Sequence, residues 1–292
     1  MKLALRVFVL ISSLSLLGCA GPDLQIEVAE GPNPWTSLDM YNDPANFQFA
    51  IMSDRTGGSL EPIFAESVVK VNRMRPEFVM CVGDLIEGYT EDPNEIQTEW
   101  NEFDSFLQKL DMPFFYVPGN HDLSNAPMYD VWTQRYGRPY YHFIYKDVLF
   151  CIVNTQDEKA TGLGRKQLQY FRNVLANNKD VRWTLVFMHQ PVWRRKDVPN
   201  WPRLEKALAD RDYTVFGGHI HQYKKEVRNG KNYYVLATTG GGRYEGAPPM
   251  SFENARFDHI TWITMTPSGP VITNILTEAI YNDNPKKKPD IP

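Results

Sequence analysis

The sequence lacks a surplus of positive charge and has few cysteines. Its 31 basic and 35 acidic side chains give a formal net charge of −4, so no general attraction to nucleic acid or anionic lipid is expected and no nucleic-acid-binding surface is evident. Its 3 cysteines are too few for a disulfide framework, and two of them, Cys81 and Cys151, lie in apolar runs typical of buried small side chains. With 42% hydrophobic residues, the 292 residues are enough for one large α/β domain or two small ones.

The first residues have the pattern of an export signal. Basic side chains precede an apolar run from Val7 to Leu17, which is shorter than the ~20 residues that a membrane-spanning helix needs. The ending Leu16-Leu17-Gly18-Cys19 resembles a bacterial lipobox. This resemblance implies a signal peptide at 1–18 and lipidation of Cys19, so we expect an exported protein anchored to a bacterial membrane, in the periplasm or at the cell surface. An ordinary secretory signal or an uncleaved anchor helix is the alternative.

Composition divides the rest of the chain into three parts. Residues 19–46 are rich in Pro, Gly, Asp and Asn and are predicted to form a tether. A folded domain is predicted over 47–280, and residues 281–292 are predicted to form a disordered tail. The sequence shows no internal repeat and does not indicate an oligomeric state.

Alternating strand and helix patterns predict an α/β fold. Buried strands are expected at 48–52, 78–82, 114–117, 184–188 and 214–216, with helices at 60–74, 96–110, 165–177 and 203–210. Hairpins are expected over 140–153, around Asn229-Gly230, and over 259–276. Since parallel strands come first and antiparallel ones later, we predict two mixed sheets packed face to face and covered by helices.

Polar residues follow five of the predicted strands. Because ligand sites of α/β sheets lie at the carboxyl ends of the strands, these residues predict one shared site. Asp, Asn and His without a thiolate suit Zn, Fe or Mn. The segments are Ser53-Asp54, Gly83-Asp84, Gly119-Asn120-His121-Asp122, Met188-His189-Gln190-Pro191 and Gly217-Gly218-His219-Ile220-His221.

This ordered set closely resembles the motifs of the calcineurin-like metallophosphoesterases, over about residues 47–265. The resemblance implies a four-layer α/β/β/α sandwich and a centre that holds two divalent metals. Asp84 would bridge the two metals. The second metal would also be held by Asn120, His189 and His219, and the first by Asp54 and His221.

The same resemblance implies a reaction. A metal-bound hydroxide would attack phosphorus in line, and the cations would neutralise the phosphoryl oxygens. His121 would protonate the leaving oxygen, and Asp122 would orient its imidazole. A structural role for His121 is the alternative.

The sequence departs from the family pattern in the first motif. Thr56 stands where the family usually has a histidine, so the first metal lacks a ligand. Purple acid phosphatases, which also lack that histidine, use a tyrosine three residues after the bridging aspartate. Glu87 occupies that position here and is a tentative ligand; a solvated loop glutamate or a helix cap is the alternative. Loss of the first metal, leaving a one-metal centre, also stays open.

Three further residues are tentative substrate-binding candidates. Arg55 follows a ligand directly and could clamp a phosphate oxygen; an ion pair elsewhere is the alternative. Trp193 and Arg194 lie in a loop after His189 and could set specificity; packing of that loop is the alternative.

The sequence therefore predicts a metal-dependent phosphoester hydrolase, either a phosphomonoesterase or a phosphodiesterase. Its expected partners are a phosphoester substrate and a membrane reached through the N-terminal lipid. The rival hypothesis is a non-catalytic or single-metal surface lipoprotein that keeps the fold as a binding module. The presence of His121 and Asp122 favours the enzyme.

Overall fold

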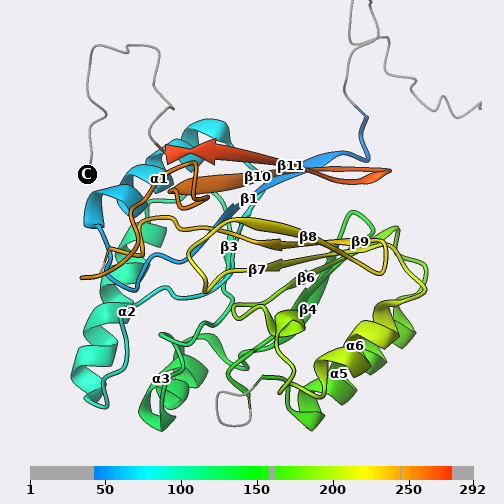
Figure 1. The fold of residues 1–292 in the computed structure, drawn as a ribbon, viewed down its shortest axis with the longest axis horizontal. Helices are drawn as coiled ribbons and strands as arrows, with labels where there is room; N and C mark the ends of the chain where they lie inside the picture. Colours follow the sequence, from blue (N-terminus) through cyan, green and yellow to red (C-terminus); the bar gives the residue numbers. More distant parts are fainter. Residues whose placement is uncertain (1–42, 158–161, 244, 278–292) are drawn as a thin grey trace, which may run out of the picture. The chain divides into compact units, whose positions relative to one another are not determined.

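The computed structural model describes residues 43–157, 162–243 and 245–277, which form two β-sheets and their helices (Figure 1). The first sheet has the strand order β11-β10-β1-β2-β3. Its first three strands in sequence are parallel, and β10 and β11 add an antiparallel hairpin beside β1. The strands are β1 Phe47–Met52, β2 Val79–Cys81, β3 Phe114–Phe115, β10 His259–Thr266 and β11 Gly269–Leu276.

The second sheet has the order β4-β5-β6-β7-β9-β8. Its four central strands are parallel, and the edge strands β4 and β8 are antiparallel to their neighbours. The strands are β4 Tyr141–Tyr145, β5 Val148–Ile152, β6 Trp183–Phe187, β7 Tyr213–Gly217, β8 Lys224–Arg228 and β9 Lys231–Val235.

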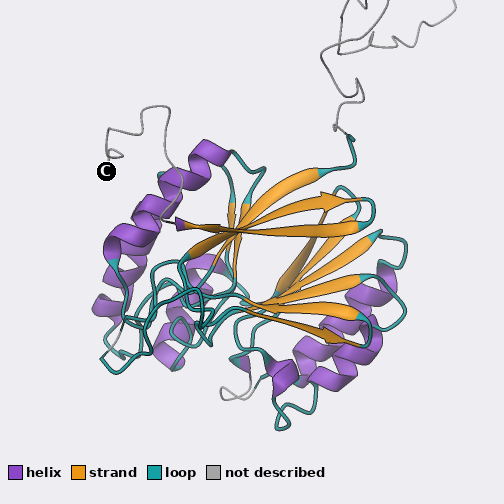
Figure 2. Cartoon of the chain, turned by 45° about the horizontal axis from the view of Figure 1, so that its top comes forward, coloured by secondary structure: helices purple, strands orange, loops and turns teal. Residues whose placement is uncertain are grey.

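Helices lie on the outer sides of the two sheets (Figure 2). The helices are α1 Glu61–Met74, α2 Pro93–Leu107, α3 Ala126–Tyr136, α5 Arg165–Asn177 and α6 Trp201–Leu208, with a 3₁₀ turn η1 at Val192–Arg194. Four of them begin with a proline in the first turn, where no N–H is needed; these prolines are Pro62, Pro93, Pro127 and Pro202.

The side chains of β5 show why the molecule is layered. Phe150 points into the core between the sheets, where its ring centroid lies 5.6 Å from that of Phe49 on β1. Its neighbours Leu149 and Cys151 belong instead to the core that α5 and α6 form on the other face. This alternation buries both faces of the sheet. The predicted arrangement of two mixed sheets between helices is confirmed.

Most predicted elements lie within a few residues of their observed positions. Helix α3 is the exception, because the sequence patterns predicted no helix between the third strand and the first hairpin. Cys81 and Cys151 are buried free thiols, as expected.

Several predictions fall partly or wholly outside the described residues. The signal peptide at 1–18, Cys19 and the tail at 281–292 are not described, and of the tether at 19–46 only residues 43–46 are. Residues 43–46 include a turn that leads into β1. Within the described ranges, none of the helices is both long and apolar enough to cross a membrane.

Candidate metal centre and active site

The carboxyl ends of strands from both sheets meet at one cavity of about 460 Å³. The first sheet contributes Asp54 after β1, Asp84 after β2, and Asn120 and His121 after β3. The second sheet contributes His189 after β6, and His219 and His221 after β7. The cavity is lined by Gly57, Gly58, Asp84, Glu87, Asn120, His121, His219, Ile220 and His221. Asp54 and His189 are fully buried and do not line it.

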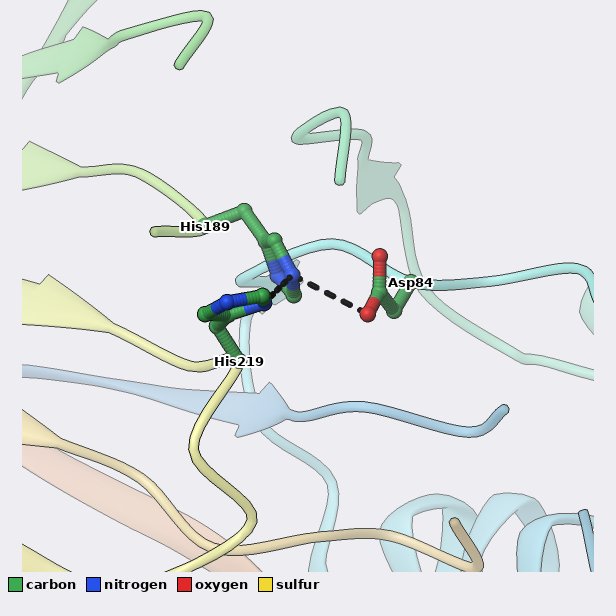
Figure 3. A group of neighbouring side chains, drawn as sticks. All are labelled: Asp84, His189 and His219. Carbon is green, nitrogen blue, oxygen red and sulfur yellow. Dashed lines mark hydrogen bonds and ion pairs between the residues drawn. The ribbon is translucent and has the colours of Figure 1, made fainter. Parts of the chain in front are cut away.

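One group of converging donor atoms surrounds Nε2 of His189 (Figure 3). This nitrogen lies 3.0 Å from Oδ2 of Asp84, 3.2 Å from Nδ1 of His219 and 2.9 Å from Oδ1 of Asn120. Nδ1 of His189 lies 2.8 Å from the carbonyl of Val82, which can only accept a hydrogen bond. Nδ1 therefore carries a proton, and Nε2 is the nitrogen available to a metal.

The second group consists of Asp54, Asp84 and His221. Nε2 of His221 lies 3.4 Å from Oδ1 of Asp54, which also accepts a 2.7 Å hydrogen bond from the backbone N–H of His219. Asp84 belongs to both groups, so one carboxylate lies between two sets of donors. This is the arrangement that a bridging ligand requires.

The residues present fit divalent cations. Asp54 and Asp84 are almost completely buried, and their only ion-pair partners among the described residues are histidines. Two buried carboxylates without a lysine or arginine require positive charge from another source. Carboxylate, amide and imidazole donors suit Zn, Fe or Mn, and two such groups match the two-metal requirement of the family resemblance.

The pKa shifts of these side chains also indicate that positive charge is needed beside the carboxylates. Burial by itself would raise the pKa of Asp84, but the neighbouring His189 outweighs it and lowers that pKa. Burial would lower the pKa of His189, but Asp84 raises it well above its usual range. Burial and the charge of His189 lower the pKa of His219 to about 4. A proton on His189 therefore takes the place that a cation would fill, and metal binding would release it.

Three of the candidate ligands lie on strained backbone. Asp84, His219 and His221 have φ values of 55°, 74° and 52°, in the left-handed region that side-chain-bearing residues rarely adopt. Two glycines permit close approach to the carboxylates. A Cβ on Gly119 would lie 2.1 Å from Oδ1 of Asp84, and one on Gly218 would lie 2.2 Å from Oδ2 of Asp54.

His121 lies at the cavity with its two nitrogens in different surroundings. Nδ1 is 2.6 Å from the backbone carbonyl of Glu87, so this nitrogen carries a proton. Nε2 lies 4.0 Å from Oδ2 of Asp84, on the side of the metal ligands. An imidazolium at His121 would thus direct its second N–H towards the reacting group.

Asp122 does not orient the His121 ring, which corrects the expectation from the sequence. Its carboxylate is fully buried and accepts hydrogen bonds from the backbone N–H groups of Gly119, Asp84 and Leu85 at 2.7, 3.0 and 2.8 Å. Asp122 therefore holds the turn that carries Asp84, and the carbonyl of Glu87 contacts the imidazole instead.

The Glu87 side chain lines the cavity but is in neither group of converging donor atoms. Its carboxylate accepts hydrogen bonds from the backbone N–H groups of Gly57, Gly58 and Ser59 at 3.3, 3.4 and 2.9 Å. Burial acts to raise the pKa of Glu87, but interactions with Thr56 and hydrogen bonds from Ser59 and Gly58 outweigh it and lower the pKa. The structure thus places Glu87 as a support of the 57–59 loop, and Thr56 beside it is fully buried.

The three tentative substrate-binding residues do not line the cavity. The buried Arg55 guanidinium pairs with Glu61 and Glu102 and donates to the carbonyl of Leu85 at 3.1 Å. Trp193 is 4% exposed and donates to Glu226, and Arg194 pairs with the same carboxylate at 3.2 Å. The structure places all three in packing and ion-pair contacts, which are the alternatives that the sequence left open.

Tyr89 is a residue at this site that the sequence patterns did not single out. Its hydroxyl accepts a 2.9 Å hydrogen bond from the Asn120 amide, whose oxygen faces His189. Its ring lies edge-on to His121 with centroids 4.8 Å apart, and the residue is 62% exposed. An aromatic residue in the loop after a ligand-bearing strand was the available signal.

Comparisons with known proteins agree with this geometry. A family profile described as "Calcineurin-like phosphoesterase" matches residues 59–223, more than half of the chain. The serine/threonine-protein phosphatase CPPED1 of Mus musculus is 25% identical over 237 residues, which cover 69% of this chain and 75% of that protein.

Solved structures show the same fold. A dimetal phosphatase from Danio rerio superposes with a TM-score of 0.57 at 12% identity, over 79% of this chain and 99% of that one. The purple acid phosphatase PPD1 of yellow lupin (Lupinus luteus) gives a TM-score of 0.58 at 14% identity, over 81% of this chain and 53% of that one. Since the family profile spans the strand-end segments from the second motif to the last histidine, this chain belongs to the calcineurin-like phosphoesterase family.

Proposed function

We propose that this protein is a metal-dependent phosphomonoesterase that acts by in-line displacement at phosphorus. The observation that carries the proposal is the shared position of Asp84 in two groups of converging donors beside His121. The name of the mouse relative, a protein phosphatase, supports a monoester over a diester. Bound divalent cations would supply an activated water and neutralise the phosphoryl oxygens.

The chain's own residues would do the rest. Asp54, Asp84, Asn120 and the three ligand histidines would hold the cations, and the buried Asp122 would keep the Asp84 turn in place. His121 would give the proton on Nε2 to the leaving oxygen, while its Nδ1–H stays bonded to the Glu87 carbonyl.

We further propose that the two metal positions differ in affinity. The position around His189 has four protein donors, counting the Asn120 amide. The position around His221 has three, because Thr56 replaces the usual histidine and the Glu87 carboxylate is bound to backbone N–H groups. Fewer donors imply weaker binding, so the His221 position would lose its metal first.

We also propose that the protein is exported and lipid-anchored through Cys19. The lipobox-like segment 16–19 supports this proposal. A Cys19→Ser variant is expected to lose fatty-acid labelling and signal cleavage, which gel mobility and a fatty-acid probe would show. Unchanged labelling of the variant would contradict the proposal.

The test of the enzyme uses a form that lacks residues 1–19. It should release phosphate from 4-nitrophenyl phosphate in the presence of Mn, Fe or Zn, and should act more slowly on bis(4-nitrophenyl) phosphate. Asp84→Asn should lower the rate by several orders of magnitude, since it removes the shared charge. Comparable rates for Asp84→Asn and wild type, with both folded, would refute the mechanism, and faster diester cleavage would refute the monoester assignment.

A further inference from the structure

Arg256 is a buried arginine without an acid partner among the described residues. It is 8% exposed, and its Nε and Nη2 atoms are buried with no hydrogen-bond acceptor in the described ranges. Its Nη1 atom reaches the carbonyl of Ile220 only at 3.5 Å. The other buried arginine in the described ranges, Arg55, differs because it pairs with Glu61 and Glu102.

The positions of Nε and Nη2 indicate which chemical group would bind them. Nε and Nη2 form one edge of the guanidinium, and the two parallel N–H groups of such an edge match the two oxygens of a carboxylate or phosphate. Leaving a charged donor buried and unpaired is costly, so a site with this geometry favours an anion. The donor pair therefore specifies the ligand's chemistry.

A second cavity, of about 280 Å³, has Arg256 in its wall. Arg243 and Asp258 line the same cavity, but they form an ion pair with each other and cancel. The charge of Arg256 is thus unbalanced there. Ser251 adds a hydroxyl, and Phe252, which is 69% exposed, adds an aromatic surface at the cavity.

This cavity adjoins the metal centre through Gly242. A Cβ on Gly242 would lie 3.6 Å from Nη2 of Arg256 and 2.9 Å from Nδ1 of His221. The guanidinium and the metal-ligand ring therefore lie against the same backbone atom. Ile220, whose carbonyl is the nearest acceptor to Arg256, lines the main cavity. Arg256 therefore lies next to a candidate ligand of the metal centre.

We propose that Arg256 binds a second anionic group, a carboxylate or phosphate, on the substrate whose phosphoryl group lies at the metal centre. This inference rests on the proposed phosphomonoesterase function and narrows it to substrates that carry an anion on the leaving group. The aromatic side chain of Phe252, which lines the same cavity, suits a leaving group with an unsaturated or aromatic body.

The test compares phenyl phosphate with its 3-carboxy and 4-carboxy derivatives by phosphate release. A meta carboxylate hardly changes the leaving ability of the phenol, so a difference in kcat/KM reports binding. The better carboxylated ester should be favoured by about tenfold or more in wild type, and this preference should be lost in Arg256→Gln and reduced in Arg256→Lys. Arg228→Gln, which alters an arginine paired with Glu205, is the matched control and should keep the preference. No preference in wild type, or one that survives in Arg256→Gln, would overturn the proposal.

Ser251→Glu gives a second route if Arg256→Gln does not fold. It places a carboxylate in the cavity wall, where it can occupy the guanidinium and abolish the preference. A preference that persists in a folded Ser251→Glu protein would count against the site.

A binding measurement separates this inference from the proposed function. Phenylphosphonate and 3-carboxyphenylphosphonate cannot be hydrolysed, and thermal stabilisation should be larger with the carboxylated compound in wild type but equal in Arg256→Gln. If no ester is cleaved with any metal while this difference is seen, the enzyme proposal fails and the Arg256 site stands. Benzoate tests whether Arg256 binds a separate anion that is not part of the substrate. If benzoate stabilises the protein as much as 3-carboxyphenylphosphonate does, the proposal that Arg256 binds a group of the substrate is overturned.

Discussion

The carbonyl of Glu87 determines which nitrogen of His121 can exchange a proton with a substrate, because it engages Nδ1. If Nε2–H protonates the leaving oxygen, His121→Ala should slow phenyl phosphate hydrolysis by about 10²–10⁴-fold. The loss should be far smaller with 4-nitrophenyl phosphate, whose leaving group needs little protonation. Steady-state kcat on both esters measures this, with His142→Ala as the control because that ring bonds Tyr170 instead. Equal losses on the two esters would exclude His121 as the general acid.

Tyr89 fixes the Asn120 amide through a single hydrogen bond. Tyr89→Phe removes that bond and frees the amide to turn its oxygen away from His189. Partners of metal ligands commonly change metal affinity by 10–100-fold, so we expect a loss of about tenfold at the His189 position. Titration calorimetry with Mn or Zn measures it, and Tyr129→Phe, at a partly exposed tyrosine of α3, is the control. Unchanged affinity would show that the amide is held by other means.

Glu87 offers a test of the metal count. Since its carboxylate bonds the N–H groups of the 57–59 loop, Glu87→Gln keeps acceptors for that loop and should leave the number of bound metals unchanged. Elemental analysis of the dialysed proteins gives the number. A loss of one bound metal per chain in Glu87→Gln would show that Glu87 is a metal ligand.

Single residues also show what the sequence could and could not predict. Asp84, His189 and His219 were predictable because each follows a buried strand, and strand ends converge at one edge. The contacts of Asp122 and Glu87 were not, because both carboxylates are engaged by backbone N–H groups of turns. No residue pattern encodes those directions.

The side chain of Arg55 connects two helices and the segment after β2. It follows β1, pairs with Glu61 of α1 and Glu102 of α2, and donates to the carbonyl of Leu85 after β2. Both glutamates are about half exposed, so the buried bond to Leu85 should matter most. Arg55→Ala should therefore destabilise the fold by about 1–3 kcal/mol, measured by urea unfolding. An unfolding midpoint equal to that of wild type would show that the contacts of Arg55 do not contribute to the stability of the fold.

Among the elements, α3 was missed although its signals are in the sequence. The Asn125 side chain caps the helix by accepting from the N–H of Met128 at 3.0 Å, and Pro127 lies in the first turn. Its apolar stripe is short, with only Met128, Val131 and Trp132 buried. Patterns of apolar spacing did not single out this helix, although they found α6, which also buries three residues. The capping residues would have found it.

The whole molecule should depend on its metals for stability as well as activity. A cation that binds the folded chain and not the unfolded one stabilises it by about 2.7 kcal/mol when present at 100 times its Kd. Chelation should therefore abolish hydrolysis and lower the melting temperature, and added Mn or Zn should restore both. Melting curves with and without chelator measure this. A chelated protein that melts at the same temperature and keeps its activity would argue against a resident metal.

The candidate metal ligands come from two sheets, which has a consequence for how the chain folds. Asp54 accepts a hydrogen bond from the backbone of His219, 165 residues later, and neither metal position is complete until the segment after β7 is in place. Contacts this distant in sequence close late, because each needs the intervening chain to be ordered first. Metal uptake should therefore be among the final events of folding. A chain that ends before His219 would keep Asp54, Asp84 and His189 but would lack the two histidines that complete the metal positions.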